Sequence, residues 1–464
     1  MVFVNPLGEE KISKLLIKFS IPAIVGMMVN ALYNIVDRIY IGNAVDLGKN
    51  GLAGITIGFP LMLIMLAIGV LFGVGGATLF SIRLGQKKEE EAEKVLGNSI
   101  TLMVVAGIIY MILGQIFLEP LLRLFGASDV VMPYSIEYMR IIFFGSVFQI
   151  LSMGVNHFIR ADGSPRIAML SMFISAGINI VLDPVFIFGF NMGMAGAAIA
   201  TVIAQAFSAI WVVYHFLGKH SKAKLHIKNL ILDSNIVNRI VSLGMPGFLL
   251  QLASSLLNTL LNRNLFIYGG DIAVSGMGII NSIQTLMLMP IIGLNQGVQP
   301  IISFNFGAKK FERVKEAVKL AIIVATSIVL VGYLATRLIP TVLVSMFNRE
   351  ADLMAFSTMA IGSWFFMMPV VGFQIIAANF FQAIGRSKSA MFLTLTRQII
   401  FLIPAVIIFP QLWGVQGLLY AAPFADFLAA VLTGYFFIRV LKDLSHLNPE
   451  NVDQSIAAES LLEV

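Results

Sequence analysis

Long apolar stretches separated by short polar connections make up most of the chain. Each stretch can supply the roughly 20 apolar residues that an α-helix needs to cross a membrane. The pattern predicts twelve spans, at residues 15–41, 52–81, 94–118, 133–157, 166–188, 193–217, 240–268, 272–304, 316–338, 354–384, 389–410 and 414–438. The predicted fold class is therefore an all-α integral membrane protein with twelve transmembrane helices.

Composition agrees with this pattern. The chain is 58% hydrophobic and only 12% charged, whereas soluble domains carry about 25% charged residues. It has no cysteine, so a disulfide or a thiolate metal site cannot form. The net charge of +6 does not predict a nucleic-acid partner, because the basic residues lie in the connections between apolar stretches.

Lysine and arginine are concentrated in alternate connections, those on the same side as the N-terminus. The connections on the other side contain only Lys49, Arg123, Arg337 and Arg349. Cytoplasmic loops are the ones enriched in Lys and Arg, so both termini are predicted to be cytoplasmic. We expect a multi-pass protein of the bacterial or archaeal cytoplasmic (inner) membrane.

The chain also contains an internal repeat. "RLGQKK" (83–88) matches "NFGAKK" (305–310), and "HFIRADGSPRIAM" (157–169) matches "NFFQAIGRSKSAM" (379–391). Six spans per half is an even number, so both halves enter the membrane from the same side, as in transporters built from parallel repeats. We predict two pseudo-symmetric six-helix lobes, residues 1–217 and 240–446, joined by a cytoplasmic linker, 218–239. Residues 447–464 form a polar tail that ends in a possible tag remnant.

"NIVLDP" (179–184) places polar groups inside the fifth span. Asn179 and Asp183 are four residues apart, so they share one face of a helix. Pro184 has no N–H, which leaves the carbonyl of Ile180 without its helical partner. A bend there would present carboxylate, amide and carbonyl oxygens together, the groups that hold a hard cation or a proton.

The first span carries a similar stripe, with Asn30, Asn34 and Asp37 at i, i+4 and i+7. Two carboxylates in one lobe predict a shared site, to which Thr201 of the sixth span could add a hydroxyl. Intramembrane acids are by default residues of an ion or substrate pathway. The alternative is a buried polar cluster that only holds helices together.

"VDRIYIG" (36–42) and "NIVLDP" resemble motifs of the MATE (multidrug and toxic compound extrusion) family, most closely its MepA-like bacterial branch. The resemblance covers essentially the whole chain. It implies a cation or proton site made by Asp37, Asn179, Asp183 and Thr201. It further implies a substrate cavity, and the positions that match its lining are Tyr33, Tyr138, Asn156 and Met172.

The C-terminal half departs from part of that family. Some relatives place cation-binding acids in the seventh and tenth spans, but these spans show Asn258, Asn262, Arg263 and Asn379 here, and no acid. We therefore expect no C-lobe cation site of that kind. Arg397 and Asp426, on neighbouring spans, are predicted to form a structural ion pair.

We thus predict a cation-coupled antiporter that exports amphipathic, mostly cationic drugs and dyes by alternating access, with H⁺ as the coupling ion. Sodium coupling at the same site and a flippase of lipid-linked saccharides are the alternatives. The five histidines are scattered and no HExxH, GxSxG or phosphate-loop motif occurs, so we expect no enzyme. We further expect no cofactor, no metal other than sodium at the cation site, no nucleic-acid partner, surrounding lipid, and a monomer.

Overall fold

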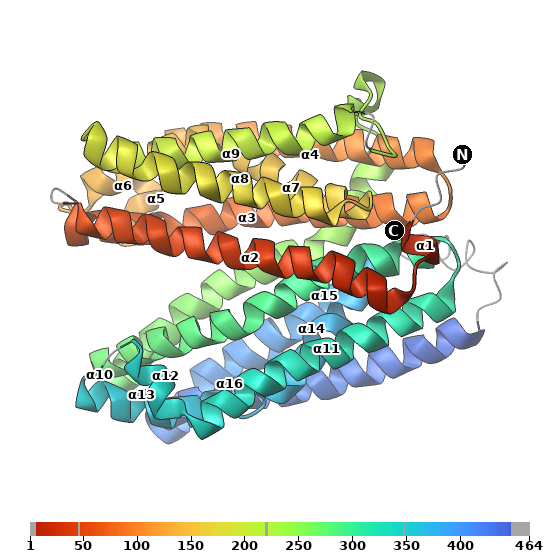
Figure 1. Cartoon of the computed structure of the whole chain (residues 1–464). Coiled ribbons are helices and arrows are strands. Elements are labelled where there is room, and N and C mark those ends of the chain that lie inside the picture. Colours follow the sequence, from red (N-terminus) through yellow and green to blue (C-terminus); the bar gives the residue numbers. More distant parts are fainter. Residues whose placement is uncertain (1–5, 45–46, 219–220, 348, 447–464) are drawn as a thin grey trace. The chain divides into compact units, whose positions relative to one another are not determined.

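The structure is a computed structural model that describes residues 6–44, 47–218, 221–347 and 349–446; the predicted tail lies outside these ranges. Every regular element within them is a helix (Figure 1). The first half contains α1 (Pro6–Glu9), α2 (Ile12–Asn43), α3 (Gly48–Gly85), α4 (Glu89–Ile116), α5 (Leu118–Leu124), α6 (Met132–Phe144), α7 (Ser146–Ala161), α8 (Pro165–Pro184), the π-helical turn η1 (Val185–Gly189), α9 (Gly193–Leu217) and the 3₁₀ turn η2 (Ile227–Leu230).

The second half is helical in the same way. It contains α10 (Ser234–Gly307), α11 (Phe311–Leu338), α12 (Pro340–Ser345), α13 (Ala351–Trp364), α14 (Met368–Ala383), α15 (Ser387–Leu395), the π-helical turn η3 (Thr396–Leu402) and α16 (Ile403–His446). Two of these elements change direction at a glycine with positive φ, a conformation that other residues rarely adopt. These are Gly270 in α10, with φ 65°, and Gly414 in α16, with φ 58°.

The described helices account for the twelve predicted spans. Eight segments are long and apolar enough to cross a membrane, and two bent pairs, α6 with α7 and α13 with α14, each qualify as one more. Two of the eight segments are double, because Ser234–Gly307 breaks at Gly270 and Ser387–Leu444 breaks at Gly414. Six unbroken segments, two double ones and two bent pairs make twelve crossings.

The described residues form two compact units. The first unit extends from Ile21 to Gln251. The second unit contains the described residues up to Ser20 and those from Leu252 onward, so the division falls inside α2 and inside α10. The linker segment 221–233 belongs to the first unit, where Asn98 of α4 donates to the carbonyls of Asn229 (3.2 Å) and Ile231 (3.1 Å). The predicted lobe boundaries at 217 and 240 stay a prediction.

Candidate functional site

Two contacts bring α2 alongside α8 and η1 in the first unit. The rings of Tyr40 and Phe188 meet edge to face, with centroids 6.3 Å apart. Gly26 lies under the thioether of Met172, and a Cβ at Gly26 would be only 2.6 Å from its sulfur. The absence of a side chain at Gly26 therefore lets Met172 pack directly on the α2 backbone.

Asp37 of α2 and Asp183 of α8 come together at this contact. Asp183 is fully buried and Asp37 is 8% exposed. The two carboxyl groups are close enough to interact, and the buried side chain of Tyr138 lies near both of them. Two ionised carboxylates have no proton to share, so this contact is favourable only when a proton or a cation lies between them.

The neighbouring polar groups complete a small cluster of oxygens. Asn179 donates its Nδ2 to Asp183 Oδ1 at 3.1 Å and to Thr201 Oγ1 at 3.3 Å. Asp37 Oδ1, Asn179 Oδ1 and Asp183 Oδ2 are buried and have no hydrogen-bond partner among the described residues. Buried oxygens in need of a partner are the chemistry that a bound cation or proton satisfies.

Pro184 ends α8 immediately after Asp183, and the chain continues in the wider π-helical turn η1. The sequence predicted an irregularity here because proline removes one backbone donor. Such π-helical turns are frequent at functional sites. The carboxylate of Asp183 thus lies at the last regular turn of its helix.

The four predicted substrate residues do not all gather at this cluster. Tyr138 is 2% exposed and lies near both acids. Tyr33 lies near Tyr138. Met172 packs on Gly26 farther along α2. Asn156 uses its amide elsewhere, because its Nδ2 donates to Ala168 O at 2.8 Å and to Ser171 Oγ at 2.6 Å. Substrate binding by these residues stays a prediction.

A second buried polar cluster, which the sequence did not predict, ties α7 to the end of α9. His215 Nε2 lies 3.1 Å from Asp162 Oδ2, and both side chains are almost fully buried. Asp162 Oδ1 also accepts a bond from the backbone N–H of Lys222 in the linker segment, at 3.2 Å. Asp162 therefore connects two helices with the linker.

In the second unit, the predicted partners Arg397 and Asp426 are in contact. Arg397 Nε donates to Asp426 Oδ1 at 2.6 Å, and Asp426 is 4% exposed. Gln398, next to Arg397 in η3, donates to Ser254 Oγ at 3.0 Å. A structural role for the ion pair agrees with this network and stays a prediction. No group of three metal-binding side chains occurs within the described residues of either unit.

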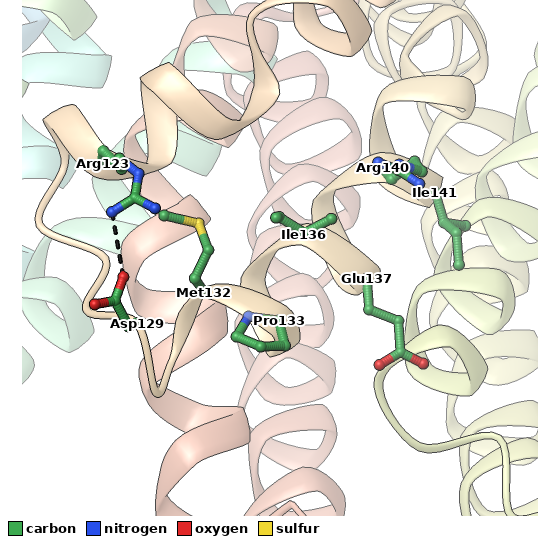
Figure 2. A pocket seen from close by; sticks show the side chains of 8 residues that line it. All are labelled: Arg123, Asp129, Met132, Pro133, Ile136, Glu137, Arg140 and Ile141. Carbon is green, nitrogen blue, oxygen red and sulfur yellow. Dashed lines mark hydrogen bonds and ion pairs between the residues drawn. The ribbon is translucent and has the colours of Figure 1, made fainter.

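The first unit also carries a cavity of about 650 Å³ beside α5, the following loop and α6 (Figure 2). Its lining mixes Arg123 and Arg140 with Asp129 and Glu137, and Arg123 pairs with Asp129 at 3.3 Å. Glu137 Oε1 accepts a bond from the backbone N–H of Ala195 at the start of α9. None of the predicted site residues lines this cavity.

Comparison with known proteins identifies the family of the chain. A model of the MatE family matches residues 22–185 and again residues 246–407, so the two halves match the same model. Multidrug export protein MepA of Staphylococcus aureus (strain MSSA476) is 28% identical over 435 residues, which cover 94% of this chain and 95% of that protein. Multidrug export protein MepA of Staphylococcus haemolyticus (strain JCSC1435) is 27% identical over 424 residues, with coverage of 91% and 93%.

Solved structures share the fold. The MATE multidrug transporter DinF-BH, in complex with a dye, is 38% identical, with a TM-score of 0.87 and coverage of 94% of this chain and 97% of that one. A MATE structure in the bent conformation is 25% identical, with a TM-score of 0.88 and coverage of 94% and 96%.

Twelve apolar segments, two halves that match the same family model and acids buried in the first unit are the features of a membrane transporter. The chain belongs to the MatE family, which confirms the resemblance seen in the sequence. The all-α fold with two six-helix lobes is likewise confirmed.

Proposed function

We propose that this transporter is a multidrug efflux antiporter that exchanges external protons for amphipathic organic cations. The observation that carries the proposal is the proximity of Asp37 and Asp183, two acids buried in an apolar unit. A pair of this kind can bind one proton in common and exchange it for another positive charge. Asn179 and Thr201 complete the proposed site.

The names of the relatives and the chemistry of the site support the substrate class. The S. aureus and S. haemolyticus relatives are named multidrug export proteins, and one structural neighbour is in complex with a dye. The cluster pairs carboxylates with the aromatic rings of Tyr33 and Tyr138, which together attract organic cations. Dyes and quaternary amines with an apolar body therefore fit better than anions.

Exchange follows from competition for the same carboxylates. A proton that reaches Asp37 and Asp183 from outside removes the negative charge that attracts a cationic drug, so the drug leaves outward. Loss of that proton to the cytoplasm restores the charge for the next drug. In this proposal both termini lie in the cytoplasm and the protein occupies a bacterial or archaeal cytoplasmic membrane, in agreement with the distribution of Lys and Arg.

Sodium is the second candidate for the coupling ion, because the unpartnered oxygens of Asp37, Asn179 and Asp183 would also suit a hard cation. We favour the proton because two neighbouring carboxyls can share it without other ligands. A flippase of lipid-linked saccharides would need a cationic cavity for its pyrophosphate, whereas the cluster in the first unit is acidic.

The test uses proteoliposomes, a monovalent cationic dye, a fixed pH gradient and a membrane potential clamped with valinomycin. One proton inward for one monovalent dye outward moves no net charge. Efflux should follow the pH gradient and ignore voltage, whereas each uncompensated charge would contribute about 2.3 kcal/mol per 100 mV. Efflux that requires sodium at constant pH would replace the proton with sodium, and export of dianionic compounds alone would overturn the substrate class.

A further inference from the structure

We propose that a groove in the second unit, between the start of α11 and the end of α16, binds an anionic phospholipid. The groove has a volume of about 440 Å³. Three lysines line it, Lys315 and Lys319 from α11 and Lys442 from α16. Its other lining residues are apolar, with Ile322, Phe437 and Ile438 among them.

The three lysines lie toward one end of the groove, where Val318 and Leu441 also line it, and beyond them the lining is apolar. α11 begins at Phe311 and α16 ends at His446, so Lys319 is near the start of one helix and Lys442 near the end of the other. Ile322 follows Lys319 by about one turn, and Ile438 precedes Lys442 by about one turn. The two helices meet at this groove with their charged ends together. The groove is therefore positively charged at the end that the lysines line and apolar along the rest of its length. A phospholipid has the same order, with an anionic headgroup followed by acyl chains.

The apolar wall is held in place by the helix behind it. Phe437 is 7% exposed, and its ring packs edge to face on Phe373 and Phe380 of α14, with centroids 5.8 and 5.4 Å away. Ile438 is 57% exposed and Ile323 is 52% exposed at the rim. A fixed aromatic floor between exposed isoleucines suits an acyl chain laid along the helices.

The charges at the mouth favour an anion. Lys319 and Lys442 are exposed and make no ion pair with any described residue, while Lys315 lies 2.8 Å from Glu312. The neighbouring acids Glu316 and Asp443 are exposed on the same two helices and do not line the groove. The ammonium groups of Lys319 and Lys442 are therefore available to bind a phosphate.

Basic pockets between spans on the cytoplasmic side are typical binding sites of anionic lipid headgroups. In the orientation proposed above, this groove faces the inner leaflet. Free phosphate shares the headgroup chemistry, but it would make no use of the apolar wall. The lipid assignment concerns residues outside the acid cluster, so it can fail or succeed independently of proton-coupled efflux.

The experiment is native mass spectrometry of the full chain in detergent, titrated with phosphatidylglycerol or with phosphatidylcholine of the same acyl chains. The wild type should retain phosphatidylglycerol more strongly. The double variant Lys319→Gln/Lys442→Gln should bind it roughly 30-fold more weakly, the order expected for the loss of two lysines near an anionic lipid, and should bind phosphatidylcholine as before. The matched control is Lys94→Gln/Lys228→Gln, two exposed lysines of the first unit, which should bind as the wild type does.

Two further arms separate the possible ligands. Ile438→Ser, which removes apolar surface and no charge, should weaken both lipids. Inorganic phosphate should fail to displace phosphatidylglycerol from the wild type; displacement at equal concentration would assign the site to free phosphate and overturn the proposal. Equal retention of both lipids by the wild type would overturn it too, as would equal losses in the groove and control variants. A lipid-independent dimer that the groove variant abolishes would assign the groove to a second copy of the chain.

Discussion

Asn179 donates its side-chain Nδ2 to Asp183 Oδ1 at 3.1 Å, one turn away along α8. This bond holds one carboxylate oxygen and leaves Asp183 Oδ2 buried without a hydrogen-bond partner among the described residues. The bond from Asn179 within α8 therefore determines that Oδ2 is the oxygen of Asp183 that is available to a proton or a cation. Asp37 approaches from α2, so the site closes only when two helices pack together.

Neutralising either acid should uncouple transport. Asp183→Asn and Asp37→Asn each keep the size of the side chain but remove the charge that a proton and a drug would share. We expect efflux of a cationic dye driven by a pH gradient to fall to background in both variants, while insertion and thermal stability stay near wild type. Proteoliposome efflux measures transport, and size-exclusion chromatography with thermal unfolding shows whether each variant is inserted and stable.

The control for this prediction is Asp129→Asn, because the Asp129 side chain is 91% exposed and, among the described residues, pairs with Arg123 alone. Exposed ion pairs contribute about 1 kcal/mol at most, so efflux by this variant should stay near wild type. Drug resistance at the wild-type level in cells that carry Asp37→Asn and Asp183→Asn would remove both acids from the proposed mechanism.

Thr201 offers a finer test of the same cluster. Its Oγ1 accepts a bond from Asn179 at 3.3 Å, and the side chain is 6% exposed. Thr201→Val keeps the shape but leaves the amide with one partner fewer, and an unsatisfied buried group costs about 1–3 kcal/mol. We expect initial rates of dye efflux to drop about tenfold in Thr201→Val and to recover in Thr201→Ser. Equal rates in the two variants would show that the hydroxyl has no part in transport.

Much of this site follows from spacing along single helices. Asn179 and Asp183 are four residues apart, so the sequence places them on one face, and Pro184 explains why α8 gives way to η1. The twelve spans are equally local, because each depends on its own apolar length.

Contacts between distant residues were beyond such reasoning. Asp162 and His215 are 53 residues apart, and no helical periodicity connects them. In the same way, Asn98 meets the carbonyl of Ile231 across 133 residues. The sequence identified a basic linker, but docking of that linker depends on the tertiary arrangement of α4, α7 and α9. The breaks at Gly270 and Gly414, by contrast, fall where the sequence predicted one span to end and the next to begin.

The docked linker should loosen when Asn98 is removed. Asn98 donates to the carbonyls of Asn229 and Ile231, and its Oδ1 accepts from the N–H of Asp233 at 2.7 Å. Asn98→Ala removes all three bonds, so the amides of residues 229–233 should exchange with deuterium at least about tenfold faster. Hydrogen-exchange mass spectrometry of the purified protein measures this rate.

Asn264→Ala is the matched substitution, because the hydrogen bond of Asn264 to a described residue stays within its own helix, to the carbonyl of Leu260 at 2.9 Å. It should leave exchange in the linker unchanged. If Asn98→Ala also leaves it unchanged, the linker is held mainly by other contacts, such as the bond from Lys222 N to Asp162.

α3 and the first part of α10, both in the first unit, cross each other closely. A Cβ built on Gly244 would overlap with the backbone oxygen of Leu71, and one on Gly75 would overlap with that of Ile240. Small residues at such crossings let two backbones approach each other.

Gly244→Ala should therefore lower the melting temperature, because backbone atoms cannot move aside as a flexible side chain would, and overpacking costs about 1–3 kcal/mol. Gly278→Ala, farther along α10 and beyond its break at Gly270, is the control, since its Cβ would meet no atom within 4 Å. Alanine favours a helix over glycine by about 1 kcal/mol, so this variant should melt at the wild-type temperature or slightly above it. Thermal unfolding in detergent, followed by circular dichroism, compares the two. Equal melting temperatures for both variants would mean that α3 and α10 do not approach each other this closely in the membrane.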